Sequence, residues 1–139
     1  METMLETPNI REVLLQTRSI AVVGLSRNPA RPSHEVAVYL QTHRYRIVPV
    51  NPHYDQILHE PCYPSLSDIP ATLPIDMVNI FRRPEAVPAI VEEAIQTGAK
   101  TIWMQVGVIH PQAAERARQA GLTVVMDRCL MVEHQYYVC

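Results

Sequence analysis

Five short apolar segments, separated by longer polar or amphipathic stretches, constrain the fold of this chain more than any other feature. They run over residues 19–24, 46–50, 76–81, 101–106 and 122–126. Most are nearly continuous apolar runs, which is typical of strands that are buried on both faces of a sheet. Such strands occur in parallel sheets, because the connections between parallel strands place helices on both faces. The segments therefore predict five parallel strands.

Three of the connections between these segments have the pattern of helices, namely 33–43, 84–98 and 111–121, and a further helix is predicted at 9–16. In 84–98, apolar residues recur at helical spacing and form one face: Val87, Ile90, Val91, Ala94 and Ile95. Prolines begin the second and third of these helices and glycines end them, as is common at helix termini. The proline-rich connection 51–75 predicts a loop with one helical turn near 65–68.

Alternating strands and helices favour one fold class. Connections between parallel strands are right-handed, which leaves few topologies. We therefore expect an α/β, Rossmann-like three-layer domain with a five-stranded parallel sheet flanked by helices. A length of 139 residues with 47% hydrophobic composition suits a single domain over 1–139. Ligands of such sheets bind outside the carboxyl ends of the strands, so the residues that follow each strand are the candidates for a site.

Charge and composition argue against several partners. A net charge of -2 and an isoelectric point near 6.3 argue against nucleic acid. No apolar run approaches the roughly 18 residues that span a bilayer, and the acidic N-terminus lacks the pattern of a secretion signal. We expect a cytoplasmic protein without a membrane partner and, with three cysteines, without a disulfide framework. Uncovered sheet edges leave room for a homo-oligomer.

The first strand is followed by GLSRNPARPS, residues 24–33, which has features of a diphosphate site. A glycine allows a tight turn, and the helix that follows offers free N–H groups and a positive dipole end to a phosphate. The loop also supplies a serine hydroxyl and two arginines: Ser26, Arg27 and Arg31. We expect a larger side chain at Gly24 to block the ligand while leaving the strand intact. The loop does not match GxGxxG, and an ordinary turn with surface arginines is the alternative.

The second strand is followed by Asn51 and Pro52, where an NAD site would carry an acidic residue for the ribose hydroxyls. The nearest acid, Asp55, lies beyond the proline. A neutral amide disfavours NAD and favours an adenosine that carries a 3′-phosphate. The alternative is that Asn51 only closes an Asn-Pro turn.

Five blocks in order resemble the small free-standing CoA-binding proteins: GLSRNPARPS, VNP at 50–52, FRRPE at 81–85, WMQVGV at 103–108 and VMDRC at 125–129. The resemblance covers about residues 10–134. The fold of that family is similar to the CoA-binding domain of the succinyl-CoA synthetase alpha subunit. The phosphohistidine of the synthetase lies in a separate domain that this chain lacks, so ligase activity does not follow from the fold.

The resemblance implies a non-catalytic protein that binds coenzyme A or an acyl-CoA. It places the diphosphate at the first loop and the adenosine beside the VNP block. The candidate cofactor-binding residues are Gly24, Leu25, Ser26, Arg27, Asn28, Arg31, Pro32, Ser33, Asn51, Pro52, Phe81, Arg82, Arg83, Gln105 and Gly107.

The later blocks also have a physical interpretation. Phe81 can border the adenine or pantetheine and the arginines after it can meet a phosphate, or Phe81 is core and the arginines are solvated. Gly107 lets a pantetheine arm pass close to the backbone, whereas Trp103 is expected in the core. For Cys129 we expect a buried residue beside an ion pair between Asp127 and Arg128.

Other functions have less support from the sequence. The six histidines show no zinc-binding spacing, and no serine stands in a GxSxG motif, so we expect neither a metal site nor catalytic residues. Two alternatives stay open. One is an NAD(P)-dependent oxidoreductase. The other is a redox or interaction protein that uses Cys129, whose neighbouring arginine favours the thiolate or a mixed disulfide with CoA.

Overall fold

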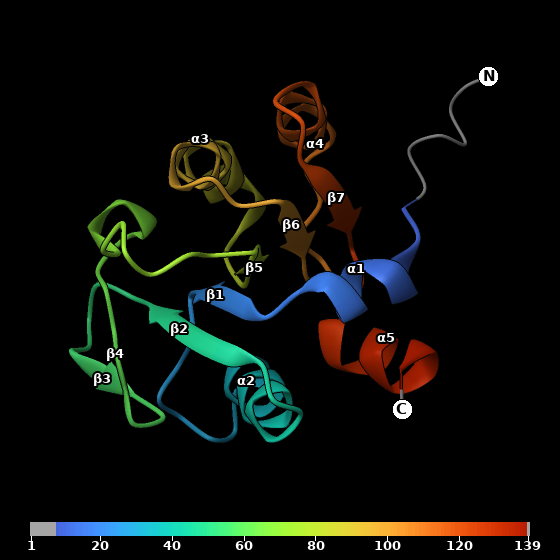
Figure 1. The fold of residues 1–139 in the computed structure, drawn as a ribbon. Coiled ribbons are helices and arrows are strands. Elements are labelled where there is room, and N and C mark those ends of the chain that lie inside the picture. Colours follow the sequence, from blue (N-terminus) through green and yellow to red (C-terminus); the bar gives the residue numbers. More distant parts are fainter. Residues whose placement is uncertain (1–7, 139) are drawn as a thin grey trace.

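The computed structural model describes residues 8–138, and its main sheet has five strands in the order β2-β1-β5-β6-β7 (Figure 1). The strands are β1 (Ser19–Val23), β2 (Arg46–Val50), β5 (Met77–Ile80), β6 (Thr101–Met104) and β7 (Thr123–Met126). Every pairing between them is parallel. The chain builds outward from β1 to β2 and then returns to the other side of β1, so the strand order reverses between β1 and β5. This confirms the predicted sheet and locates its switch point.

Helices cover both faces of the sheet (Figure 1). Helices α3 (Val87–Thr97) and α4 (Pro111–Gln119) pack on one face and share one apolar cluster with it. Helices α1 (Ile10–Gln16), α2 (Pro32–Thr42) and α5 (Leu130–Tyr137) pack on the other face and share a second cluster. The architecture is the expected three-layer, Rossmann-like α/β fold.

Two elements were not predicted. Helix α5 carries no continuous apolar stripe, and among its residues only Leu130 and His134 are buried, so its sequence gives little helical periodicity. A small antiparallel hairpin pairs β3 (Gln56–Ile57) with β4 (Glu60–Pro61) inside the expected loop. Its turn places Leu58 and His59 at positive φ without the glycine that usually marks such a turn. The predicted helical turn is confirmed as a 3-10 turn (Leu66–Asp68), and another, Pro84–Ala86, precedes α3.

Helix α5 is held against α2 by a cluster of rings. The buried His134 lies with its Nδ1 atom 2.8 Å from the hydroxyl of Tyr39, and the rings of His43 and Tyr45 lie beside it. Burial lowers the pKa of His134, and the neighbouring His43 lowers it further. This packing holds the middle of α5 against the C-terminal end of α2.

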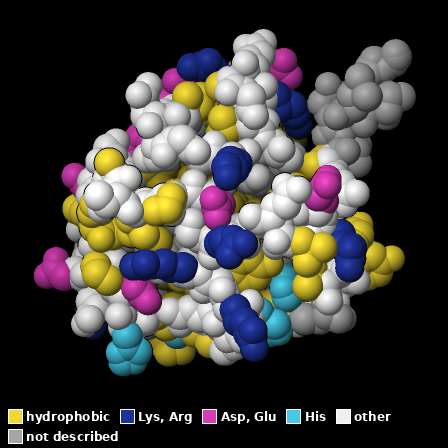
Figure 2. All heavy atoms as spheres, viewed as in Figure 1, with side chains coloured by type: hydrophobic (Ala, Val, Ile, Leu, Met, Phe, Trp, Pro, Cys, Tyr) yellow, Lys and Arg dark blue, Asp and Glu magenta, His cyan; other side chains and the backbone are white. Residues whose placement is uncertain are grey.

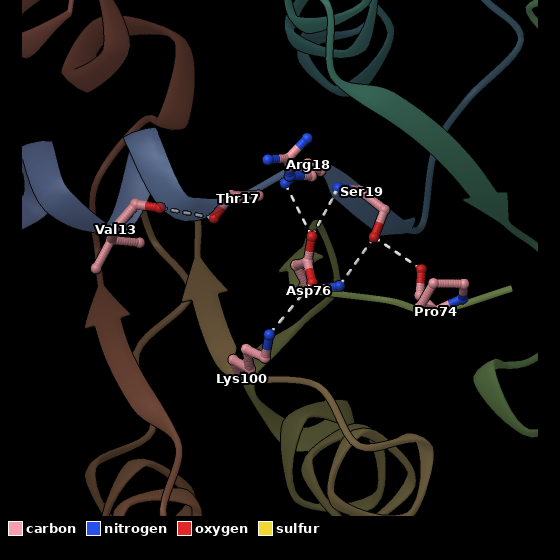
Figure 3. A network of polar contacts seen from close by, with 7 residues as sticks. All are labelled: Val13, Thr17, Arg18, Ser19, Pro74, Asp76 and Lys100. Carbon is pink, nitrogen blue, oxygen red and sulfur yellow. Dashed lines mark hydrogen bonds and ion pairs between the residues drawn. The ribbon is translucent and has the colours of Figure 1, made fainter.

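Asp76 ties the opposite edge of the sheet together (Figure 3). Its Oδ2 atom accepts hydrogen bonds from the backbone N–H groups of Arg18, at 2.9 Å, and Ser19, at 3.2 Å. The hydroxyl of Ser19 donates to the carbonyl of Pro74, at 2.8 Å, and Lys100 Nζ lies 3.9 Å from Asp76 Oδ1. One carboxylate therefore joins the chain segments that enter β1, β5 and β6.

We expect Asp76→Ala to lower the free energy of unfolding by about 2–3 kcal/mol, because two backbone donors lose a charged acceptor. Urea denaturation measures the change. The control is Glu115→Ala, which removes a carboxylate that is 58% exposed and contacts only the side chains of Arg118, at 3.8 Å, and Gln119, at 3.3 Å, among the described residues. This change should alter stability by less than about 0.5 kcal/mol. Equal changes in the two variants would show that Asp76 has no special role at this edge.

The surface carries charges of both signs. On the face that Figure 2 shows, Lys and Arg side chains are interspersed with Asp and Glu, and no broad field of one sign is present. Among residues 8–138, no helix is long and apolar enough to cross a membrane.

Candidate functional site

The residues that follow the strands lie side by side at the carboxyl edge of the sheet. The register pairs Val23 with Ile80, Ile80 with Met104, and Met104 with Met126. The next residues along these strands, Gly24, Phe81, Gln105 and Asp127, therefore form one row. The row faces the layer of α2 and α5, so loops that are distant in sequence meet at the switch point.

A first cleft of about 320 Å³ lies at this row, between the first loop and the end of β2. Its lining consists of candidate residues together with Tyr54, which the sequence analysis missed: Gly24, Ser26, Arg31, Pro32, Ser33, Asn51, Tyr54 and Phe81. None of these residues carries a carboxylate. Tyr54 follows a proline turn and gave no sequence signal beyond its aromatic ring.

Hydrogen bonds within the first loop leave several donors free. Ser26 N–H donates to the hydroxyl of Ser33, and Asn28 N–H donates to the hydroxyl of Ser26, both at 3.0 Å. The Ser26 hydroxyl can therefore donate its own proton outward. Ser33 N–H, in the first turn of α2, has no acceptor in the described part of the chain, and the exposed Arg31 caps the helix with its backbone alone. Free N–H groups, a hydroxyl and a guanidinium at a helix start suit a diphosphate.

Gly24 is required by the packing of the sheet. Its φ is +90°, and a Cβ atom would clash with the carbonyl oxygen of Phe81 and lie 3.1 Å from its carbonyl carbon. The expectation that a larger residue would leave the strands intact is therefore wrong. Glycine is needed because β5 passes close to the end of β1, whether or not a ligand is bound.

Asn51 holds the first loop in place. Its Nδ2 atom donates to the carbonyl of Leu25 at 3.0 Å, and its Oδ1 atom accepts from His53 N–H at 2.9 Å. The second bond confirms the Asn-Pro turn, with Pro52 exposed beside it. Leu25 itself is fully buried, so its side chain lies in the core and lines neither this cleft nor the larger one described next.

A second, larger cleft of about 730 Å³ lies between α2 and the first turn of α5. The candidate residues that line it are Pro32, Phe81, Arg82, Arg83, Gln105 and Gly107. The two clefts share Pro32 and Phe81, so an extended ligand can run through both. The residues missed by the sequence analysis are Glu35, Val36, Pro84, Val106, Val108 and Met131, most of which look like ordinary core or helix residues. Cys129, which the sequence analysis named for a redox role, also lines this cleft.

Gln105 presents an unpaired amide donor to the larger cleft. The residue is only 5% exposed, and its Oε1 atom accepts from the backbone N–H of Leu130 at 3.0 Å. Because a backbone N–H is a donor, the Gln105 atom that it contacts must be the amide oxygen. The amide nitrogen Nε2 is therefore the donor that remains available. It has no acceptor among residues 8–138 and is open to the cleft, where it can donate to a ligand that carries an acceptor.

The segment after β7 is held to the loop after β6. Gly107 N–H donates to Asp127 Oδ1 at 2.8 Å, and Trp103, fully buried as predicted, donates its Nε1 proton to the carbonyl of Arg128. The expected ion pair between Asp127 and Arg128 is wrong, because Arg128 lies 3.7 Å from Glu133 instead. The Asp127 carboxylate instead holds Gly107 in place at the wall of the larger cleft.

Like Leu25 and Pro52, the candidates Arg27 and Asn28 line neither of the joined clefts. Arg27 stacks over the ring of Tyr54, with its Cζ atom 5.3 Å from the ring centre, and lines a separate cleft of about 320 Å³ with His34 and His59. Asn28 shapes the first loop, since its Oδ1 atom accepts from Ala30 N–H at 2.9 Å.

Asn79 is a further polar residue that the sequence analysis missed. It lies on β5, two residues before Phe81 and on the same face of the sheet, and it is fully buried. Neither atom of its amide has a hydrogen-bond partner among the described residues. An unpaired buried amide lowers the stability of the folded state. Asn79 therefore carries an unsatisfied polar group on β5, two residues before Phe81 of the clefts.

Comparison with known proteins assigns this arrangement to a family. A family model described as a CoA binding domain matches residues 18–135. The chain belongs to this family of CoA-binding domains. The resemblance found in the five sequence blocks is thereby confirmed.

Relatives of this CoA-binding domain occur both alone and within larger enzymes. Uncharacterized protein YneT of Bacillus subtilis is 42% identical over 125 residues, which is 90% of this chain and 91% of YneT. The structure of a hypothetical protein from Pyrococcus horikoshii covers all of both chains with a TM-score of 0.92 and 38% identity. An ADP-forming acetate–CoA ligase of Archaeoglobus fulgidus is 37% identical over 95 residues, but these are 67% of this chain and 14% of the ligase.

Among residues 8–138, no group of three or more His, Cys, Asp or Glu side chains is arranged to hold a metal ion.

Proposed function

We propose that this chain binds coenzyme A or an acyl-CoA without transforming it, with the diphosphate at the start of α2 and the pantetheine arm in the larger cleft. The observation that carries the proposal is the junction of the two clefts at Pro32 and Phe81. The smaller cleft offers hydrogen-bond donors to phosphate, and the larger one is bordered mostly by apolar side chains. Coenzyme A likewise has a diphosphate that is joined to a pantetheine arm, so one molecule could occupy both clefts.

The first cleft supplies groups for the nucleotide end. Ser26 hydroxyl, Ser33 N–H and the Arg31 guanidinium are free to donate to diphosphate oxygens. Tyr54 and Asn51 border the space that is left for the adenosine. Because no carboxylate lines this cleft, the acidic partner that NAD requires for its ribose is missing, which supports CoA over NAD.

The larger cleft supplies groups for the arm. Gln105 Nε2 can donate to a pantetheine amide carbonyl, because it is open to the cleft and has no acceptor among the described residues. Arg82 and Arg83, both exposed, stand at the entrance where the diphosphate would join the arm. Among the described cleft residues, no nucleophile is hydrogen-bonded to a side-chain base, which supports a binding role without catalysis.

Thermal unfolding in the presence of CoA, acetyl-CoA, dephospho-CoA, NAD and ATP tests the proposal. A ligand that binds only the folded state stabilises it by about 2.7 kcal/mol at a hundred times its Kd. We expect CoA and acetyl-CoA to raise the midpoint by several degrees, dephospho-CoA to raise it less, and NAD to leave it unchanged. A midpoint that no CoA compound moves, even at millimolar concentration, would overturn the proposal.

A further inference from the structure

Cys129 stands at the end of the larger cleft that lies away from the first loop. It is the N-cap residue of α5, is half-buried, and lines the cleft beside Met131 and Gln105. Its side chain makes no capping hydrogen bond, so the sulfur atom is not committed to the helix.

The backbone around Cys129 is fixed on both sides. Arg128 N–H donates to the carbonyl of Met104 at 3.2 Å, and the Arg128 carbonyl accepts from Trp103 Nε1 at 2.8 Å. On the other side, Leu130 N–H donates to Gln105 Oε1 at 3.0 Å. The thiol is therefore held at a defined place in the cleft wall.

An independent feature points to a ligand at this place. Gln105 is 95% buried, lines the same cleft, and has an Nε2 atom without an acceptor among the described residues. Because its other amide atom binds the residue next to Cys129, the free donor and the thiol lie at the same end of the cleft. Pantetheine ends in an amide, a short ethyl link and a thiol. An amide carbonyl that accepts from Gln105 would leave the terminal sulfur close to Cys129.

We propose that Cys129 forms a reversible mixed disulfide with the pantetheine sulfur of coenzyme A, by exchange with a disulfide that contains coenzyme A. This inference rests on the function proposed above. The Cys129 thiolate attacks the CoA sulfur of CoA disulfide, or of another mixed disulfide of CoA, and the Cys129 Sγ–S bond forms as the original S–S bond breaks. The second thiol leaves as a thiolate and takes a proton from solvent. The disulfide itself is the oxidant, and a small thiol reverses the step.

Cys62 offers a contrast within the same chain. It is buried, its Sγ atom donates to the carbonyl of Asn51 at 3.4 Å, and burial raises the pKa of its thiol. A buried, protonated thiol exchanges slowly. Cys129 is thus the cysteine among residues 8–138 that lines the larger cleft.

The test treats the reduced full chain with CoA disulfide and measures intact mass. We expect one CoA moiety per chain, removed by dithiothreitol, absent from Cys129→Ser and retained in Cys62→Ala and Cys139→Ser. Cystamine, which lacks the nucleotide, should react at least about tenfold more slowly, because binding raises the local concentration of CoA disulfide. Acetyl-CoA, which has no free thiol, should protect Cys129. Peptide mapping of the wild-type adduct assigns the cysteine even where a variant folds poorly.

Calorimetry of the reduced chain with CoA separates the two proposals. If CoA binds but CoA disulfide gives no adduct on Cys129, the inference is wrong and the proposed function stands. If cystamine reacts as fast as CoA disulfide and acetyl-CoA does not protect, Cys129 is merely an accessible thiol and the inference is again wrong. If the reduced chain does not bind CoA, the proposed function fails and the inference fails with it.

Discussion

Replacing Gly24 with valine should prevent the chain from forming a stable native sheet. A Cβ atom at this position would clash with the backbone of Phe81, and the φ of +90° is strained for any residue with a side chain. Backbone at the edge of a buried strand cannot move aside without breaking the pairing of β1 with β5. We expect a loss of more than about 4 kcal/mol in the free energy of unfolding, measured by urea denaturation and circular dichroism.

Gly121→Val is the matched control for this prediction. Gly121 has a similar φ of +94°, but a Cβ atom there would meet nothing within 4 Å. The control should therefore show the cost of the backbone conformation without the clash. If the two valine variants are equally stable, the close approach of β5 to Gly24 does not constrain the fold. Loss of ligand binding in Gly24→Val would not locate the site, because the fold is lost with it.

Arg31→Ala should weaken CoA binding by about 10- to 100-fold while leaving the fold intact. The exposed side chain borders the first cleft and makes no hydrogen bond or ion pair with another described residue. A charge-assisted bond to the diphosphate contributes about 1.5–3 kcal/mol, and a factor of ten in affinity corresponds to about 1.4 kcal/mol. Titration calorimetry at two salt concentrations measures the loss, which should be larger at low salt.

Arg46→Ala provides the control for Arg31. Arg46 is also exposed, but it begins β2 and so lies at the opposite edge of the sheet from the clefts. Its removal changes the net charge by the same amount and should leave CoA affinity unchanged. Equal losses in both variants would indicate a general charge effect, and an Arg31 variant with altered stability but normal affinity would remove Arg31 from the site.

The strands and most helices could be predicted from the sequence because their signals are local. Buried strands require apolar runs, and the prolines and glycines at helix ends act on neighbouring residues. Helix α5 and the β3–β4 hairpin lacked such signals. Helix α5 depends on the packing of His134 against rings from α2, and the hairpin turn is made by Leu58 and His59 in place of glycine.

The candidate site, too, could be predicted from the sequence only in part. The order of strands and loops determined that the first loop, the VNP block and the residues after β5 and β6 would meet at one edge of the sheet, because parallel strands place their carboxyl ends together. Only the tertiary structure decided which side chains face the clefts. It buried Leu25, committed the Asn51 amide to the loop, and brought Tyr54 to the first cleft and Cys129 to the larger one. Side-chain exposure depends on contacts between distant segments, and such contacts leave no local pattern in the sequence.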